Sequence, residues 1–248
     1  MTSLPPSQCC ASGSLHEGQS KGEIKTIGNI ASAQAYLSYP PNKQTGNAIL
    51  FLSDIFGLDL VNSKLIADQF AANGYFVVMP DLFKGDPVPV DHPESFSVMD
   101  WLQGHLPQHT DPIITEVLKE MRDSFGCKRV GGVGYCYGGK FVCRYLRAGQ
   151  IDVGFIAHPT FIEPDELKAI QGPLSIAAAA DDYLFPPEKR HESEEILATL
   201  DVPYQLSIFS EVEHGFAVRC DMNKSRHKFA KEQAFGQAVA WLNHYLSK

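Results

Sequence analysis

The chain lacks any dense block of lysine and arginine. Its 248 residues carry 21 Lys and Arg against 29 Asp and Glu, which gives a formal net charge of −8. A negative surface of this kind repels phosphate backbones and anionic membrane surfaces. We therefore expect no nucleic acid and no membrane among the partners of this protein, and a small molecule as its ligand.

Long hydrophobic runs are also missing. Nowhere do about 18 apolar residues follow one another, and the start, MTSLPPSQCCASGS, has no basic segment followed by an apolar one. These absences predict a soluble, cytoplasmic protein without a transmembrane helix or secretory signal. The 6 cysteines do not resemble a disulfide framework in a chain of this length, so we expect free thiols in a reducing compartment.

Zinc-finger spacing is absent as well. Cys9 and Cys10 stand near His16, but no second Cys/His pair follows at the distance that a finger needs. We therefore expect no metal and no organic cofactor, and we interpret residues 1–21 as a solvated or loosely docked N-terminal arm. No linker and no internal repeat divide the remainder, which predicts a single domain over residues 22–248.

Apolar stretches and amphipathic stretches alternate along that domain. Continuous apolar strands separated by helices are typical of a mostly parallel sheet covered on both faces, so the predicted class is α/β. The first two strands should form an edge hairpin around Gly28 and Asn29. The predicted strands are 22–27, 33–39, 48–54, 75–81, 129–135, 151–159, 173–180 and 203–210, and the predicted helices are 62–75, one from Asp111, 137–148, 187–200 and 225–246.

Two details of this pattern can be checked in a structure. The helix over 62–75 should be N-capped, with Leu65, Ile66 and Phe70 on its buried face and Gly74 as its terminator. Residues 82–109 contain four prolines and only weak periodicity, which predicts an excursion over one end of the sheet, in the position of a lid.

The segment Gly134-Tyr135-Cys136-Tyr137-Gly138 follows a predicted strand and opens a predicted helix. This is the setting of the nucleophile elbow, in which the glycines avoid clashes in a tight turn and the helix N-terminus favours a thiolate. One alternative is a buried structural cysteine. Another is a phosphate-binding loop, although Gly-Lys-Ser/Thr is absent.

A nucleophilic cysteine needs an imidazole base held by an acceptor. In the α/β-hydrolase order the acid and the histidine follow later strands, and Asp181 or Asp182 and then His214 occupy those places. His158 ends another strand on the same edge of the sheet and is the rival base. The remaining histidines fall in the arm, the excursion or predicted helices.

The motifs GYCYGG, DDYLFP, EHGF and SDIFGL together resemble the dienelactone hydrolase family of α/β-hydrolases, over about residues 22–246. The arm is similar to the fungal-type branch of that family. The resemblance implies an α/β-hydrolase fold with about eight strands, an activity on carboxylic esters or lactones of the carboxymethylenebutenolidase type, and no cofactor. It also implies a triad of Cys136, His214 and Asp182, because the family aspartate stands four residues before a proline, here Pro186.

The same resemblance implies an oxyanion hole formed by the backbone N–H groups of Ile55 and Tyr137. Bacterial members place a glutamate before that isoleucine, where it accepts a hydrogen bond from the resting thiol, whereas this chain has Asp54. Family members also clamp a substrate carboxylate with two arginines. The excursion of this chain offers only Lys84, and Arg219 comes one residue after the position of the second arginine.

Cysteine as nucleophile restricts the substrate class. A thiolate is itself a good leaving group, so the tetrahedral intermediate collapses forward only when the departing group is at least as stable. Enol esters, activated lactones and thioesters meet this condition, whereas amides do not. The function predicted is therefore hydrolysis of a small activated ester or enol lactone, with His158 and Arg219 in the substrate pocket. A thioesterase or acyl-transfer enzyme, and a non-catalytic binding member, remain as alternatives, and the protein is expected to be a monomer or homodimer.

Overall fold

The structure is a computed structural model that describes residues 1–28 and 34–246 of the chain. In this part of the chain eight strands form one sheet in the order β1-β2-β4-β3-β5-β6-β7-β8. β1 and β2 run antiparallel, and β3 to β8 are parallel to one another. The prediction of a mostly parallel sheet is confirmed. The strands are β1 (Glu23–Thr26), β2 (Gln34–Ser38), β3 (Asn47–Leu52), β4 (Phe76–Pro80), β5 (Arg129–Tyr135), β6 (Val153–Ala157), β7 (Leu174–Asp181) and β8 (Tyr204–Glu213).

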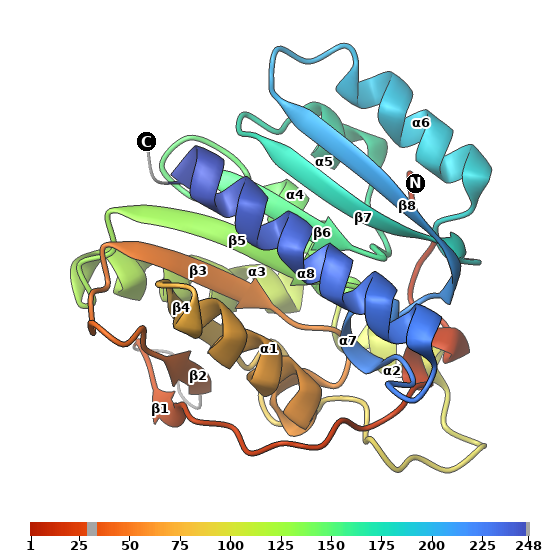
Figure 1. Ribbon diagram of the computed structural model, residues 1–248, viewed down its shortest axis with the longest axis horizontal. Helices are drawn as coiled ribbons and strands as arrows, with labels where there is room; N and C mark the ends of the chain where they lie inside the picture. Colours follow the sequence, from red (N-terminus) through yellow and green to blue (C-terminus); the bar gives the residue numbers. More distant parts are fainter. Residues whose placement is uncertain (29–33, 247–248) are drawn as a thin grey trace.

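Helices cover both faces of this sheet, as expected. In Figure 1, α1 and α8 lie in front of the sheet, while α3, α4 and α5 lie behind it. The α-helices are α1 (Val61–Ala72), α2 (Val98–Gln103), α3 (Pro107–Asp123), α4 (Tyr137–Tyr145), α5 (Pro164–Lys168), α6 (Pro187–Leu197), α7 (Phe216–Arg219) and α8 (Ser225–Leu246), and two short 3-10 helices are η1 (Gln8–Ala11) and η2 (Gly57–Asp59).

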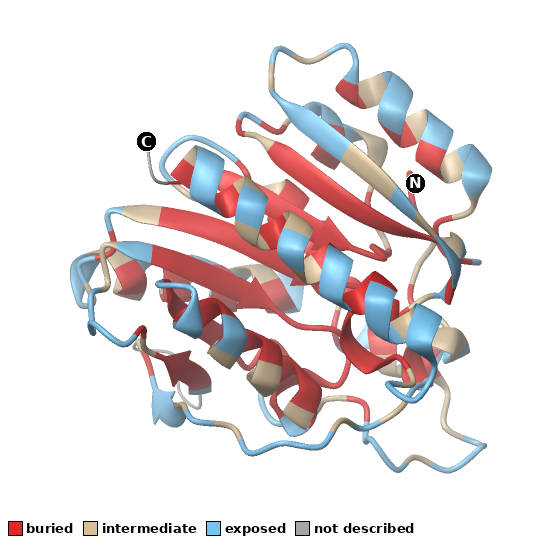
Figure 2. Ribbon diagram, viewed as in Figure 1, coloured by how far each residue is buried: buried red, intermediate tan, exposed pale blue. Residues whose placement is uncertain are grey.

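The central strands are apolar throughout because neither of their faces meets water. Every residue of β4 and β6 is buried, and β3 is buried after its first residue. Figure 2 shows these strands in red between helices whose outward faces are pale blue. Burial on both faces of parallel strands is what removes the alternation of polar and apolar residues from their sequences. No helix in the described part of the chain is long and apolar enough to cross a membrane.

The start of α1 differs from the prediction. The helix begins at Val61, and no side chain caps it, because Asn62 lies inside the first turn. The Asn62 amide instead donates to the carbonyl oxygens of Ser14 and Val218, at 2.9 and 3.0 Å. This side chain therefore joins the N-terminal arm to α7. Gly74, with φ of 98°, terminates the helix as predicted.

The buried face of α1 is narrower than predicted. Ile66 and Phe70 are buried as expected, whereas Leu65 is only partly buried. Leu65 lies instead beside the arm, where it lines a cavity together with Leu15.

The excursion over residues 82–109 is more regular than predicted. It contains α2, which Ser97 caps by accepting a hydrogen bond from the Asp100 amide at 3.2 Å. The following helix begins at Pro107 and not at Asp111. Pro107 stands in the first turn, where a missing N–H costs nothing, and Pro112 lies inside the helix. Two prolines in this segment can each begin a helix, and Asp111 before Pro112 is the stronger start signal in sequence, although Pro107 is the one that the helix uses.

The N-terminal arm, residues 1–21, is docked over its first half, where most residues are buried or half-buried, whereas residues 12–21 are mostly exposed. Thr2, Ser3 and Cys10 are buried, and the Leu4 amide donates to the Leu184 carbonyl oxygen at 2.8 Å. Figure 1 shows this red segment starting near β7 and β8 and passing α7 on its way to β1. Composition alone did not reveal this packing. Part of the predicted Gly28-Asn29 hairpin connection lies outside the described residues.

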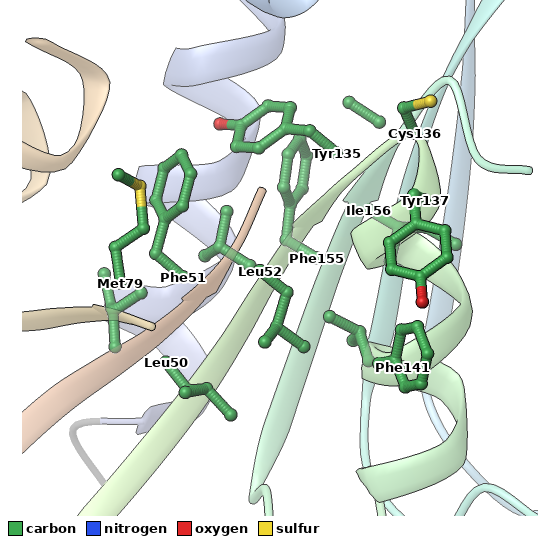
Figure 3. Close-up of a cluster of buried hydrophobic side chains, with 14 of the residues drawn as sticks. Leu50, Phe51, Leu52, Met79, Tyr135, Cys136, Tyr137, Phe141, Phe155 and Ile156 are labelled. Carbon is green, nitrogen blue, oxygen red and sulfur yellow. The ribbon is translucent and has the colours of Figure 1, made fainter. Parts of the chain in front are cut away.

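The turn between β5 and α4 holds a residue with strained backbone. Cys136 has φ of 52° and ψ of −114°, a conformation that side-chain-bearing residues rarely adopt. A Cβ on Gly138 would lie 2.0 Å from the Leu52 carbonyl oxygen, and one on Gly134 would lie 2.6 Å from the Gly138 carbonyl oxygen. The expected steric role of the two glycines is confirmed. In Figure 3 the Cys136 sulfur lies at the end of the buried cluster, with Tyr137 and Phe141 following along α4.

We predict that Gly138→Ala lowers the free energy of unfolding by about 3 kcal/mol or more, because the added methyl group meets backbone that cannot rotate away. Chemical denaturation measures this. Gly236→Ala is the matched control, since a Cβ there meets nothing within 4 Å and the site is an exposed helix interior. The Gly236→Ala control should raise the free energy of unfolding by roughly 0.5–1 kcal/mol. Equal effects of the two substitutions on the free energy of unfolding would contradict the steric role of Gly138.

Candidate active site

Loops at the carboxyl ends of neighbouring strands bring the predicted residues together. Cys136 follows β5, Asp182 follows β7 and His214 follows β8. Parallel strands end at the same edge of a sheet, so residues far apart in sequence meet there. Nearly all of their side-chain surface is buried.

Asp182 orients the imidazole of His214. The distance from Asp182 Oδ2 to His214 Nδ1 is 2.9 Å. The other carboxylate oxygen accepts hydrogen bonds from the amides of Leu184 and Phe185, at 2.9 and 3.2 Å. These bonds fix the carboxylate, and the carboxylate leaves Nε2 of the ring directed away from it. Asp181 is exposed and lies in the β7–β8 pairing opposite Glu213, so it is not the partner of this ring.

Cys10 of the N-terminal arm is the third neighbour of this ring, and the sequence reasoning missed it. Its Sγ lies 3.5 Å from Cys136 Sγ and 3.6 Å from His214 Nε2. One ligand-type atom from each of Cys10, Cys136 and His214 lies within 4.8 Å of the other two. The motif QCC signalled cysteines near the start of the chain, but its sequence distance from the elbow gave no reason to join them.

The electrostatics of the site favour a thiolate at Cys136. Burial by itself raises the pKa of this thiol, but the hydrogen bond from Cys10 and the charge of His214 outweigh burial and hold the pKa well below its usual range. Burial likewise lowers the pKa of His214, yet the charges of Cys136 and Asp182 raise it to about 10. Burial and the neighbouring sulfur raise the pKa of Cys10. These directions favour a charged pair of Cys136 and His214 over a neutral pair, with the proton of Cys10 retained.

The two backbone amides predicted to form an oxyanion hole belong to Tyr137 and Ile55. Tyr137 is the first residue of α4, so its N–H has no acceptor within the helix. Among the described residues, the Ile55 amide makes no hydrogen bond to a backbone or side-chain acceptor. The chain at Ile55 is held in place, because its carbonyl oxygen accepts from the Val88 amide at 2.9 Å. The excursion thus positions one of the two predicted donors.

The excursion also holds the other predicted donor through the Tyr137 side chain. The Tyr137 hydroxyl donates to the His105 carbonyl oxygen at 2.5 Å, and it lies 2.8 Å from Thr110 Oγ1. The Trp101 ring stacks on His105 with centroids 4.2 Å apart. Lys84, the basic residue that the excursion offers in place of an arginine, is exposed.

Asp54 and Arg219 form a buried ion pair with each other. Arg219 Nη1 lies 2.7 Å from Asp54 Oδ2, and Arg219 Nε donates to the Ser12 carbonyl oxygen at 2.5 Å. Burial raises the pKa of Asp54 to about 6, against the opposing effect of the Arg219 charge. The register shift noted in the sequence thus directs the guanidinium to Asp54 and to the arm.

His158 lies behind the candidate base. It is fully buried, its ring centroid is 5.0 Å from that of His214, and its two ring nitrogens have no hydrogen-bond partner among the described residues. Burial, together with the charge of His214, holds the pKa of His158 well below its usual range. His158 is therefore a poorer candidate for the base than His214, because its neutral imidazole has no carboxylate partner among the described residues.

The arm leaves one opening beside the base. A cavity of about 240 Å³ is lined by His214, Gly215, Arg219 and arm residues that include Gly13. His16, which stood near Cys9 and Cys10 in sequence, is directed elsewhere, because its Nε2 lies 2.8 Å from the Cys220 carbonyl oxygen. The sulfur and nitrogen atoms that do gather in space are those of Cys10, Cys136 and His214.

Comparison with known proteins places this site in a family. The model described as "Dienelactone hydrolase family" matches residues 33–246. The chain is 74% identical over 248 residues to "Hydrolase pyvD" of Aspergillus violaceofuscus, with 100% of both chains covered. It is 49% identical over 256 residues to "Hydrolase tropI" of Talaromyces stipitatus, with 100% of both chains covered. It is 33% identical over 255 residues to "Dienlactone hydrolase 1" of Gibberella moniliformis, with 98% of this chain and 95% of that one covered.

Solved structures share the fold. The dienelactone hydrolase from Anabaena variabilis matches with a TM-score of 0.63 at 14% identity, over 93% of this chain and 100% of that one. The esterase Est2 of Thermogutta terrifontis matches with a TM-score of 0.64 at 15% identity, over 92% of this chain and 96% of that one. At such identities the likeness concerns the α/β-hydrolase fold alone.

We predict that Cys136 is a thiolate at about pH 7, well below the usual thiol pKa of about 8.5. The difference in ultraviolet thiolate absorbance between the wild type and Cys136→Ala should correspond to nearly one thiolate per chain at that pH. Cys127→Ala is the control, because burial raises the pKa of Cys127 to about 11 and its removal should not change the signal. A Cys136 signal that appears only above about pH 9 would count against the ion pair.

Proposed function

This chain belongs to the dienelactone hydrolase family of α/β-hydrolases, a family of ester and lactone hydrolases, and from that premise we propose that it cleaves a small activated ester or enol lactone through Cys136, His214 and Asp182. The single observation that carries the proposal is the hydrogen bond of 2.9 Å between His214 and Asp182, with the elbow sulfur beside the other edge of the same ring.

In the first step the Cys136 thiolate attacks the carbonyl carbon of the substrate. A C–S bond forms, and the carbonyl electron pair moves to oxygen, which the amides of Ile55 and Tyr137 stabilise. Such a donor is worth about 3 kcal/mol in comparable sites. Collapse of the intermediate breaks the C–O bond of the ester, and the imidazolium of His214 gives its proton to the leaving oxygen, which leaves His214 neutral for the second step.

In the second step water cleaves the thioester. Neutral His214 removes a proton from water at Nε2 while Asp182 holds the proton on Nδ1. The resulting tetrahedral intermediate expels the Cys136 thiolate and releases the carboxylic acid. General-base help of this kind contributes about 10²–10⁴-fold. The imidazolium and thiolate pair is then restored.

The substrate class follows from the sulfur nucleophile and from Arg219. Because a thiolate leaves readily, forward collapse needs an alcohol part that departs as a stabilised anion, as in an enol lactone or an aryl ester. Arg219 is bound to Asp54, and the excursion, which carries the other arginine of the clamp in family members, offers only the exposed Lys84. We infer that this enzyme does not hold its substrate through a pair of arginines on a carboxylate.

Access to the sulfur requires a movement of the N-terminal arm. Cys136 and Cys10 are both 0% exposed, so no ester carbonyl reaches Cys136 Sγ while Cys10 lies against it. The cavity beside His214 gives substrate a place next to the covered sulfur. We infer that binding displaces the segment around Cys10, whose anchor points lie on both sides of it.

Asp181, the sequence neighbour of Asp182, provides a matched control for testing Asp182 as the acid of the triad. We predict that Asp182→Asn lowers kcat on an activated aryl ester by about 10³–10⁴-fold, because the ring loses the acceptor that fixes its tautomer. Asp181→Asn removes an exposed carboxylate from the same segment, and it should change kcat less than about 3-fold. If both variants lose activity equally, or if Asp181→Asn alone loses it, the assignment of the acid fails.

Two measurements test Cys136 as the nucleophile: removal of its sulfur, and a comparison of rates on different classes of acyl substrate. We predict that Cys136→Ala abolishes hydrolysis of enol lactones and aryl esters, since the other sulfur beside His214, that of Cys10, has a raised pKa and so makes a poor nucleophile. Steady-state rates on these substrates and on an acyl thioester are measured side by side. Undiminished turnover by Cys136→Ala would contradict the mechanism, and a preference for thioesters would favour the acyl-transfer alternative.

A further inference from the structure

We propose that Cys10, Cys136 and His214 form a zinc-binding site, in which the N-terminal arm supplies one ligand and the proposed catalytic residues supply two. Metal binding would follow from the positions of these donors alone. The expected consequence is reversible inhibition of ester hydrolysis, because zinc would bind the sulfur of Cys136, and this consequence rests on the proposed function.

The distances between the donor atoms fit a tetrahedral zinc ion. With Zn–S bonds of about 2.3 Å and Zn–N bonds of about 2.0–2.1 Å, two sulfur ligands lie about 3.7 Å apart, and a sulfur and a nitrogen lie about 3.5 Å apart. The Sγ atoms of Cys10 and Cys136 are 3.5 Å apart, and Cys10 Sγ lies 3.6 Å from His214 Nε2. Two edges of the tetrahedron are therefore formed by the fold already.

The chemistry of the donors selects the metal. Two thiolates and an imidazole are soft or intermediate ligands that favour zinc over magnesium or calcium. Two thiolates also neutralise the charge of Zn²⁺, which matters in a site where both cysteines are fully buried. Three protein ligands leave the fourth position for water, as in open zinc sites of the Cys₂His type.

The surroundings of His214 support the same assignment. A histidine that binds zinc commonly donates its other ring N–H to a carboxylate, which fixes the ring and strengthens the metal bond. Asp182 accepts from His214 Nδ1 at 2.9 Å and is itself held by two backbone amides. Nε2 is thus the free ligand atom, and it is the atom that faces Cys10.

The arm holds Cys10 at the site from both sides. The Leu4 amide bonds to the Leu184 carbonyl oxygen before Cys10, and the Ser12 carbonyl oxygen accepts from Arg219 after it. Ions have a route, since His214 also lines the cavity of about 240 Å³ that the arm borders. Binding converts the Cys10 thiol to a thiolate and frees the lone pair of His214 Nε2, so two protons leave for solvent as one Zn²⁺ enters.

The experiment uses the full chain kept reduced with a phosphine, and it titrates Zn²⁺ by calorimetry and Cd²⁺ by thiolate charge-transfer absorbance. We expect one metal ion per chain, and at least about a 100-fold loss of affinity in Cys10→Ala and in Cys136→Ala. Cys9→Ser is the matched control, because Cys9 is the neighbour of Cys10 but lies outside the donor set. It should change the affinity less than about 3-fold, and circular dichroism verifies that each variant is folded.

Absence of stoichiometric binding by the folded wild type, or unchanged affinity in folded Cys10→Ala, would overturn the metal site. Should Cys10→Ala not fold, Cys10→Ser serves in its place with the same expectation. A second measurement separates the two proposals: Zn²⁺ at its binding midpoint should halve ester hydrolysis by the wild type, and Mg²⁺ should not. Binding that depends on Cys10 in a protein whose hydrolysis survives Cys136→Ala would uphold the metal site and refute the proposed function.

Discussion

The close approach of the elbow turn to β3 is the constraint on which the rest of the site depends. Cys136 adopts φ of 52°, and Gly138 lies so near the Leu52 carbonyl oxygen that no side chain fits between them. This contact fixes the start of α4 beside the loop that carries Ile55. In the proposed mechanism this turn sets the sulfur and the two backbone amides in place before substrate arrives, which is the preorganisation that a developing oxyanion needs.

The N-terminal arm gives this family site a second layer. Cys10 lies against both the sulfur and the imidazole, and Arg219 is bound to Asp54 and to the arm. The same contacts have two consequences. They bury the sulfur of Cys136, and they add the Cys10 sulfur as a third potential metal ligand to the proposed catalytic pair of Cys136 and His214. A metal ion and an ester would then compete for one sulfur.

Much of the fold and the core of the site could be predicted because local signals determine them. Apolar strands at regular intervals gave the sheet, and Gly134 and Gly138 around Cys136 gave the elbow, since both patterns arise from sterics within a few residues. The docking of Cys10 could not be predicted, because it depends on a contact 126 residues apart in sequence. The ion pair of Arg219 with Asp54 could not be predicted for the same reason. Asn62 matches a capping signal in sequence, but its side-chain amide binds the carbonyl oxygen of Ser14 in the arm.

The central claim is that Cys136 carries the acyl group during hydrolysis. Mixing the enzyme with an activated aryl ester, quenching in acid within one turnover and digesting the protein for mass spectrometry measures this directly. We expect one acyl group per chain on the peptide that contains Cys136. In Cys136→Ser we expect no thioester adduct, and at most an oxygen ester that forms slowly. Hydrolysis without an adduct, or with the acyl group on another residue such as Cys10, would contradict it.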